Sequence, residues 1–274
     1  MEGQIIKILS NDYTVLSNNK EYVCKSRGKF RNDNITPLVG DYVIFDDKNN
    51  YILDIKERKN HLNRPSVANI DMAFIITSLK SPDFSLNLLD KLLLVCHINN
   101  IEPIICLTKK DLLNNKELKE IKKIIKYYKS LGYKVLYNTE LRKIKKLFKG
   151  KITVFTGQTG SGKSTLINKL DKTLNFETGE ISKALGRGRH TTRCTTLVNL
   201  YKGKVVDTPG FSDIDLTLYS DEEIKNSFIE FNKYNCPYKD CKHLNEKECE
   251  VKKYIGTKIL KSRYENYKKF LERK

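Results

Sequence analysis

The stretch that decides the fold of this chain runs from Gly157 to Ser164 and reads GQTGSGKS. It fits the phosphate-loop pattern G-x-x-x-x-G-K-[ST]. An apolar run at 151–157 (KITVFTG) precedes it, and a helical pattern over 163–170 follows it. Because this strand, loop and helix form the context that the pattern requires, the stretch predicts a domain that binds nucleotide phosphates.

The residue types of this loop suit phosphate chemistry. Glycines let backbone N–H groups turn inward around phosphate oxygens at a helix N-terminus, and the Lys163 ammonium neutralises the β and γ oxygens. The Ser164 hydroxyl is the expected Mg²⁺ ligand. The expected nucleotide-binding residues of this loop are Gly157, Gln158, Thr159, Gly160, Ser161, Gly162, Lys163, Ser164 and Thr165.

Around the loop, from about residue 64 to about residue 213, apolar strands alternate with helical segments. This alternation is typical of a parallel sheet with crossover helices, and it predicts a central α/β domain. The expected helices are 86–99, 115–131 and 163–170. The expected strands are 70–78, 103–108, 134–138, 151–157, 195–201 and 204–210.

A second motif, Thr108-Lys109-Lys110-Asp111, follows the apolar run PIICL and resembles the N-K-x-D guanine-specificity motif, with Thr108 in place of Asn. The Asp111 carboxylate can accept hydrogen bonds from the N1–H and the N2 amino group of guanine, a pair that adenine does not offer. The stem of Lys109 can cover the flat face of the base. This motif predicts that the nucleotide is GTP.

The order of the two motifs is informative. In ordinary GTPases the phosphate loop comes first, whereas here the guanine motif precedes it. A circular permutation moves the chain ends and keeps the sheet. We therefore expect a circularly permuted GTPase domain, in which strands 103–108 and 151–157 can lie side by side.

A third motif, Asp207-Thr-Pro-Gly210, ends another apolar strand. The Asp207 carboxylate can hold Mg²⁺ through water, and the Gly210 N–H can sense the γ-phosphate. The loop beyond Gly210 can then differ between the triphosphate and diphosphate states, and it leads directly into the segment that follows the domain.

Residues 1–62 show five short β-type runs separated by turn signals, which predict a small all-β barrel. An oligonucleotide-binding (OB) fold is the expected type, although an SH3-like barrel would give nearly the same pattern. Basic residues interleave with Tyr22 and Phe30, which would suit an RNA-facing surface, and a solvated barrel face would account for them equally well.

Residues 214–274 contain the pattern Cys236-x₄-Cys241-x-His243-x₅-Cys249. Three cysteines and one histidine suit a single tetrahedral zinc, and a fourth protein ligand leaves no open position for water, so a structural zinc is expected. Beyond it, apolar residues from Val251 to Leu271 recur near helical spacing and predict a mostly helical end with an amphipathic helix.

The formal net charge of +18 favours a polyanionic partner such as nucleic acid. The longest apolar runs are far too short to cross a bilayer, and the first residues lack a secretory pattern. We expect a cytoplasmic monomer without a membrane partner.

The barrel, the permuted motif order and the Cys-His pattern together resemble the RsgA (YjeQ) family of bacterial GTPases, and the resemblance covers essentially the whole chain. Its most specific part is Gly186-Arg-Gly-Arg-His-Thr-Thr-Arg193, similar to the G-R-G-[KR]-H-T-T-R segment of that family. The resemblance implies an OB barrel over 1–62, a permuted GTPase domain over 63–213 and a zinc-binding domain over 214–274. It also implies GTP hydrolysis stimulated by the small ribosomal subunit, rRNA binding and a role in late subunit maturation.

The same resemblance assigns the catalytic group. In many GTPases a Gln directly after D-x-x-G orients the attacking water, but Phe211 holds that place here. The resemblance transfers this role to His190, whose imidazole could orient or deprotonate the water. Either Thr191 or Thr192 would complete the Mg²⁺ shell.

Three other interpretations stay open at this point. The chain could act on the large ribosomal subunit, as other permuted GTPases do, or it could be an RNA-binding scaffold in which the nucleotide is structural. It could also be a phosphate-loop ATPase or kinase. Competition of bound GTP by ATP separates the last possibility, because Asp111 should reject adenine.

Overall fold

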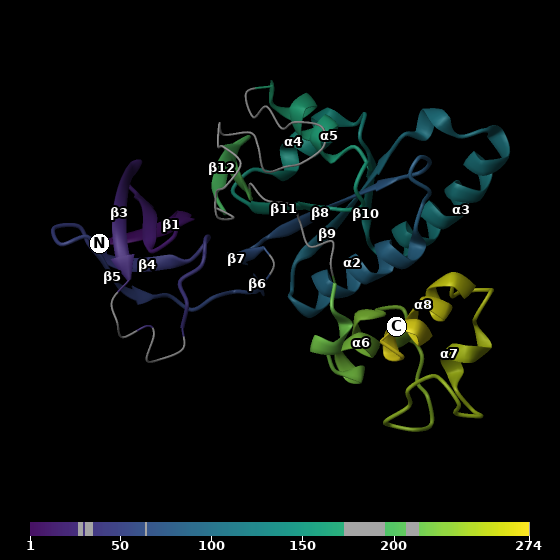
Figure 1. Ribbon diagram of the computed structural model, residues 1–274. Helices are drawn as coiled ribbons and strands as arrows, with labels where there is room; N and C mark the ends of the chain where they lie inside the picture. Colours follow the sequence, from purple (N-terminus) through teal and green to yellow (C-terminus); the bar gives the residue numbers. More distant parts are fainter. Residues whose placement is uncertain (27–29, 31–34, 64, 173–194, 207–213, 274) are drawn as a thin grey trace. The chain divides into compact units, whose positions relative to one another are not determined.

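The computed structural model describes residues 1–26, 30, 35–63, 65–172, 195–206 and 214–273 (Figure 1). The chain forms two compact units, each made of several segments. The first contains Met1–Phe74, Asn138–Thr156 and Gly162–Phe211, and the second contains Ile75–Tyr137, Gly157–Ser161 and Ser212–Lys274.

The amino-terminal part is a closed five-stranded barrel, as predicted. Its strands are β1 (Glu2–Leu9), β2 (Asp12–Ser17), β3 (Lys20–Ser26), β4 (Tyr42–Asp46) and β5 (Tyr51–Ile55), in the order β1-β2-β3-β5-β4. Strands β3 and β5 pair in parallel, and the other pairs are antiparallel. Alternate residues such as Ile5, Val15 and Phe45 fill the interior because neighbouring side chains on a strand point to opposite faces.

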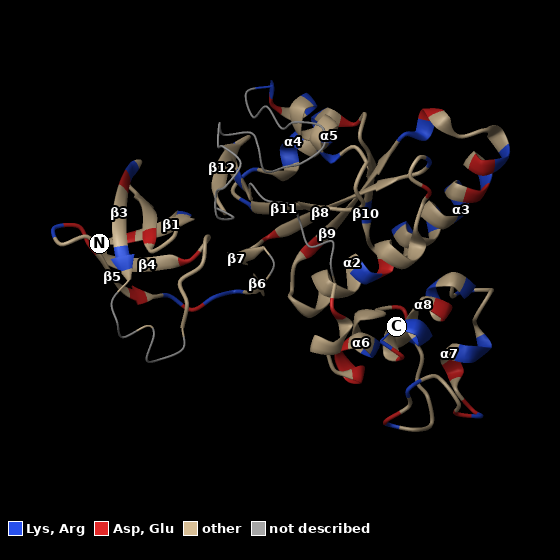
Figure 2. Ribbon diagram, in the orientation of Figure 1, with Lys and Arg blue, Asp and Glu red and all other residues tan. Residues whose placement is uncertain are grey.

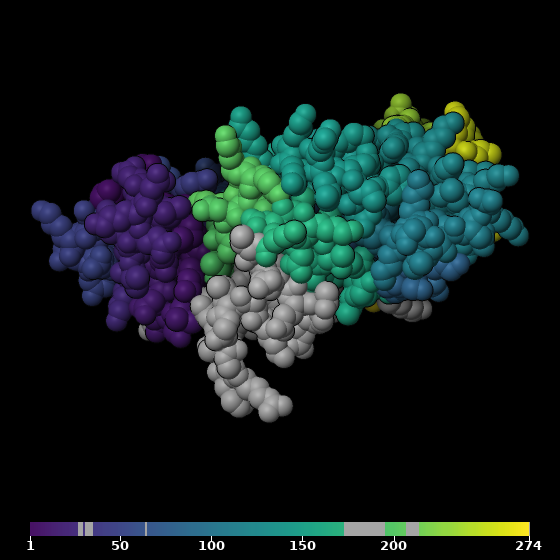
Figure 3. Space-filling model, turned by 90° about the horizontal axis from the view of Figure 1, so that it is seen from above, coloured from purple at the N-terminus to yellow at the C-terminus, as the bar shows by residue number. Residues whose placement is uncertain are grey.

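Strand β1 also meets the segment before β12 (Leu197–Leu200). Lys7 forms a β-bridge with Thr196, and the N–H of Ile8 donates to the carbonyl oxygen of Thr195 at 3.4 Å. Figure 3 shows the green residues around β12 against the purple barrel. A short pair, β6 (His61–Asn63) and β7 (Ser66–Ala68), belongs to the same unit.

The central sheet has six strands, in the order β10-β9-β8-β11-β13-β12. They are β8 (Met72–Ser78), β9 (Glu102–Thr108), β10 (Lys134–Tyr137), β11 (Ile152–Thr156), β12 and β13 (Gly203–Val206). β9 pairs with β10 in parallel, as does β11 with β13. All seven residues of β8 are buried, as a central strand requires.

Two expectations about this sheet are wrong. Strands β9 and β11 do not lie side by side, because the fully buried β8 takes the place between them. The sheet is also not wholly parallel, because β12 pairs with β13 in antiparallel register through the short turn at Tyr201 and Lys202. Both turn residues have positive φ angles, which suits a tight hairpin.

Three of the four described helices of this domain begin at the predicted residues. The four helices are α2 (Leu86–Ile98), α3 (Asn115–Ser130), α4 (Leu141–Leu147) and α5 (Lys163–Leu170). The Ser85 hydroxyl accepts a hydrogen bond from Leu88 N, and Asn114 and Glu117 form a capping box. These caps fix the starts of α2 and α3; α4 was not predicted.

The carboxyl-terminal part is mostly helical, with α6 (Asp221–Ser227), α7 (Glu250–Lys253) and α8 (Lys261–Leu271) and short 3₁₀ turns at Leu216–Leu218 and Phe231–Lys233. The expected apolar periodicity from Val251 to Leu271 covers two helices rather than one. Gly256 adopts φ 83°, a left-handed conformation that does not continue a helix, and Ile255 bridges to Ile259. Among the described helices, none combines the length and apolar character needed to span a lipid bilayer.

Candidate nucleotide site and metal cluster

The phosphate-loop sequence links β11 to α5. Gly157, Gly160 and Gly162 have φ angles of 134°, 75° and 92°, which L side chains rarely adopt. A Cβ on Gly157 would also clash with the carbonyl oxygen of Ile76, so this backbone lies directly against β8. The helix begins at Lys163, directly after Gly162. This geometry fits a phosphate cradle at a helix N-terminus.

The remaining residues of the loop differ in exposure. Thr159, Gly160 and Thr165 are exposed, whereas Gln158 and Ser164 are half-buried. Burial lowers the pKa of Lys163. The hydroxyl of Ser161 is fully buried and has no hydrogen-bond partner among the described residues.

Thr108, the last residue of β9, joins the guanine-type motif to the phosphate loop. Its side chain is buried, and its hydroxyl donates to the carbonyl oxygen of Ser161 at 2.6 Å. The same hydroxyl lies 3.4 Å from the carbonyl oxygen of Thr77. A threonine at this position therefore makes a direct tie to the phosphate loop, although the motif usually carries Asn there.

Lys109 makes a second tie between the two motifs. Its ammonium group donates to the carbonyl oxygen of Gly160 at 2.8 Å and to that of Ser81. Lys109 itself adopts φ 56°, and Ser81 adopts φ 55°. Left-handed conformations at residues other than glycine cost about 1–3 kcal/mol each and persist where the surrounding structure holds them. The hydrogen bonds of Thr108 and Lys109 hold Gly160 and Ser161 of the phosphate loop in place.

The other two residues of the motif lie in the short 3₁₀ turn Lys110–Leu112. The Lys110 ammonium lies over the Tyr137 ring, 4.8 Å from its centroid. The Asp111 side chain is exposed.

Ser81 is a contact that the sequence did not single out. It lies in the loop after β8, and β8 is the neighbour of β9 in the sheet. The segment Lys80-Ser-Pro-Asp83 follows directly after an apolar strand. Its position could have indicated this contact, because ligands bind at the carboxyl ends of the strands in open α/β folds.

Five of the expected site residues lie outside the described residues. They are His190, Thr191, Thr192, Asp207 and Gly210. Strand β13 ends at Val206, immediately before Asp207.

The three cysteines and the histidine of the carboxyl-terminal pattern come together as one cluster. The ligand atoms of Cys236, Cys241, His243 and Cys249 all lie within 4.8 Å of one another. His243 Nδ1 is 3.4 to 3.5 Å from each sulfur, and Cys236 Sγ is 3.9 Å from Cys249 Sγ. A tetrahedral zinc has bonds of about 2.3 Å to sulfur and about 2.0 Å to nitrogen. These bonds require about 3.5 Å between the nitrogen and each sulfur and about 3.8 Å between two sulfurs. The cluster fits such an ion.

The fold and the two motifs together define a circularly permuted GTPase. A family model described as RsgA GTPase matches residues 55–217, and one described as RsgA N-terminal domain matches residues 2–52. The chain belongs to the RsgA family of GTPases.

Named relatives are similar over nearly their full length. "Small ribosomal subunit biogenesis GTPase RsgA 2" of Oceanobacillus iheyensis is 48% identical, over 99% of this chain and 96% of the relative. The protein named small ribosomal subunit biogenesis GTPase RsgA of Streptococcus mutans is 47% identical, over 99% and 94%.

Solved structures are similar as well. YloQ, described as a circularly permuted GTPase, has a TM-score of 0.82 and 36% identity, and the match covers 99% of this chain and 93% of YloQ. YjeQ from Thermotoga maritima has a TM-score of 0.83 and 32% identity, and the match covers 99% and 97%.

Proposed function

We propose that this protein is a GTP hydrolase that acts in maturation of the small ribosomal subunit, binds its rRNA and is released when GTP is hydrolysed. One observation carries the nucleotide part of the proposal: Thr108 and Lys109 bond directly to the backbone of Ser161 and Gly160. The guanine-type motif thus meets the phosphate loop despite the reversed order in the chain. The relatives' names supply the ribosomal part.

In this proposal, residues 157–165 hold the phosphates and Asp111 selects guanine. Backbone N–H groups of the loop point at the phosphate oxygens, Lys163 neutralises them, and the exposed Asp111 carboxylate accepts from N1–H and the N2 amino group. Bound Mg²⁺ neutralises charge that develops on the phosphates. Ser164 and Asp207, with Thr191 or Thr192, would hold that ion, and the Gly210 N–H would contact the γ-phosphate.

His190 would orient the attacking water, because Phe211 offers no hydrogen-bonding side chain where many GTPases have Gln. A site that lacks this Gln hydrolyses GTP slowly by itself. Contact with the partner would then accelerate hydrolysis, and hydrolysis would end the contact. The rate of GTP hydrolysis would therefore set how long the protein stays bound to its partner.

The Cys-His cluster would hold one zinc with a structural role. Four protein ligands complete a tetrahedral shell, so no position is left for a reacting water. Three thiolates and a neutral imidazole are the donor set that zinc prefers.

Contact with rRNA would use the basic surface of the chain. The net charge is +18, and Figure 2 shows Lys and Arg on several elements, among them α3 and α4. On the barrel, the Lys20 ammonium lies over the Tyr22 ring, 5.1 Å from its centroid. Basic groups beside aromatic rings suit RNA, whose phosphates and bases they can bind. The protein would work in the cytoplasm as a monomer.

Co-sedimentation with purified ribosomal subunits tests the proposal. We expect the protein to sediment with small subunits in a non-hydrolysable GTP analogue and to be released in GDP. The His190→Ala variant should stay on the subunit in GTP. Binding to large subunits instead, or equal binding in GTP analogue and GDP, would contradict the proposal; release of the His190→Ala variant in GTP would favour the scaffold interpretation.

A further inference from the structure

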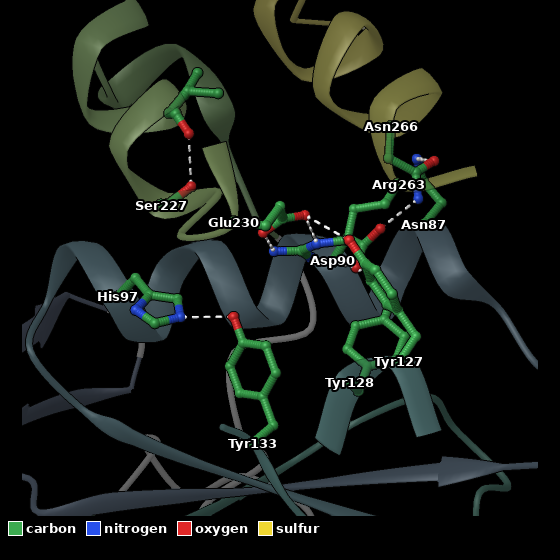
Figure 4. A network of polar contacts seen from close by, with 11 residues as sticks. Asn87, Asp90, His97, Tyr127, Tyr128, Tyr133, Ser227, Glu230, Arg263 and Asn266 are labelled. Atoms are coloured by element: carbon green, nitrogen blue, oxygen red, sulfur yellow. Dashed lines mark hydrogen bonds and ion pairs between the residues drawn. The ribbon is translucent and has the colours of Figure 1, made fainter. Parts of the chain in front are cut away.

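A buried charge cluster joins helix α8 to helix α2 within the second compact unit (Figure 4). The Arg263 guanidinium of α8 donates to Asp90 of α2 at 2.6 Å and to Glu230 at 2.5 Å. The side chains of Arg263, Asp90 and Glu230 are 1%, 0% and 3% exposed. Two carboxylates thus share one guanidinium out of contact with water.

Neutral donors complete the cluster. The Tyr128 hydroxyl donates to Asp90 at 2.6 Å, the Asn266 amide donates to Asp90 at 2.7 Å, and the Tyr127 hydroxyl donates to Glu230 at 3.1 Å. A buried polar network whose members are all bonded holds its elements in one arrangement, because any shift leaves a desolvated group unpaired. Helices α8 and α2 are therefore fixed to each other.

The same helix α8 also holds the backbone of the Cys-His cluster. The Tyr264 hydroxyl donates to the carbonyl oxygen of His243, and the Tyr267 hydroxyl donates to that of Lys242, both at 2.6 Å. His243 is one of the four cluster residues, and its φ angle of 59° is left-handed. A metal in the cluster thus determines where the acceptors for these two tyrosines lie.

On α2, the contacts with α8 fall on the first turns, next to the loop that touches the nucleotide motifs. The Asn87 amide donates to Asn266 at 3.0 Å, one position after the helix starts. The preceding loop carries Ser81, the acceptor for Lys109, and Lys109 also donates to Gly160. Polar contacts at both ends, connected by helix α8 and by the short chain segment between Ser81 and Asn87, therefore link the metal cluster to both nucleotide motifs.

We propose that Tyr264, Tyr267, Arg263 and Asn266 of α8 are positioning residues that couple the metal cluster to the nucleotide loops, so that zinc and guanine nucleotide each raise the affinity for the other. The inference rests on the proposed function, which names zinc and guanine nucleotide as the two ligands. It adds a route between them that is separate from the chain connection at residues 207–213. Linkage requires the two effects to be equal.

The experiment uses the full chain and two equilibrium measurements. The first is the Kd of fluorescent GDP with zinc present and after zinc removal by a chelator. The second is the Kd of zinc, by chelator competition, with and without saturating GDP. We expect each ligand to change the Kd of the other by the same factor, about five-fold or more. Circular dichroism would confirm that every sample is folded.

The double variant Tyr264→Phe/Tyr267→Phe keeps both rings and removes only the two hydroxyls. It should retain zinc and GDP binding and lose the coupling, so that its zinc-loaded form binds GDP as weakly as the zinc-free protein. Tyr254→Phe, on the segment between α7 and α8, is the matched control and should keep the full coupling. Arg263→Lys should keep part of the coupling that Arg263→Met loses.

The possible failures are distinguishable. Unchanged GDP affinity after zinc removal, or full coupling in the double variant, would overturn this inference and leave the proposed function standing. Failure of the zinc-loaded chain to bind GDP at all would overturn both.

Discussion

The hydroxyl of Thr108 donates a hydrogen bond of 2.6 Å to the carbonyl oxygen of Ser161. Thr108 ends strand β9, and Ser161 lies in the phosphate loop after β11, although β8 separates these two strands in the sheet. The bond therefore joins the loop that follows β11 to the end of β9, two strands that are not neighbours in the sheet. It makes the relative position of the two motifs a property of the fold rather than of the nucleotide.

Replacing Thr108 with Val tests this bond. Valine has nearly the same shape and no hydroxyl, so the Ser161 carbonyl loses its donor. Loss of a buried hydrogen bond costs about 1–3 kcal/mol, and we expect GDP to bind about ten-fold more weakly. The measurement is a titration with fluorescent GDP. Thr153→Val is the matched control, because the buried Thr153 hydroxyl has no partner among the described residues, and GDP affinity should not change.

Replacing Asp111 with Asn tests the choice of base. The amide can no longer accept from both the N1–H and the N2 amino group of guanine, whereas its N–H₂ can donate to the 2-oxo group of xanthine. We expect GDP affinity to fall by at least about 100-fold, a loss of about 2.7 kcal/mol, and xanthosine diphosphate to bind in its place. Competition binding with both nucleotides measures this. An unchanged preference for guanine would place the specificity elsewhere.

Replacing Cys249 with Ser tests the metal cluster. One zinc per chain should be measured for the unaltered protein by elemental analysis, and almost none for the variant, because oxygen ligates zinc more weakly than thiolate. Structural zinc contributes to folding directly, so limited proteolysis should cut the variant within residues 236–260. Cys24→Ala, in the barrel, should retain the metal. Full zinc content in Cys249→Ser would contradict the assignment.

Replacing Arg263 with Met should make stability depend on pH. Burial raises the pKa of Asp90, and the Arg263 guanidinium opposes that rise, as do the hydrogen bonds from Tyr128 and Asn266. Without the guanidinium, the folded-state pKa of Asp90 rises further above its unfolded value. The folded protein keeps its full stability below the unfolded-state pKa, where Asp90 is neutral in both states. It loses stability as the pH rises through the folded-state pKa, because the buried Asp90 must then become charged.

The Arg263→Met variant should therefore lose more stability at about pH 8 than at about pH 5, with a loss of about 3–5 kcal/mol near neutral pH. Urea unfolding at several pH values measures this. Lys268→Met removes an exposed ion pair with Glu265 and should cost less than about 1 kcal/mol. A pH-independent loss in Arg263→Met would contradict the role of Asp90.

Local signals in the sequence were enough for the motifs and most elements. The phosphate loop predicted the positions of β11 and α5, and the helical patterns over 86–99 and 115–131 predicted the starts of α2 and α3. The spacing of Cys236, Cys241, His243 and Cys249 predicted a cluster that the structure contains. These signals depend on neighbouring residues or on a short segment, so they can be read without the fold.

Features that depend on contacts between distant segments could not be predicted in this way. Strand order needs the whole sheet, so the position of β8 between β9 and β11 was missed. The Gly256 turn interrupts an apolar periodicity that continues on both sides of it. The pairing of Asp90 with Arg263 joins residues 173 positions apart, and nothing near either residue indicates it.

We propose above that this permuted GTPase hydrolyses GTP in response to the small ribosomal subunit. The most direct measurement is the rate of phosphate release from GTP by the purified protein alone, with small subunits and with large subunits. We expect slow phosphate release by the protein alone, a rise of at least about ten-fold with small subunits, and no rise with large subunits. An equal rate in all three conditions, or a rise only with large subunits, would contradict the proposal.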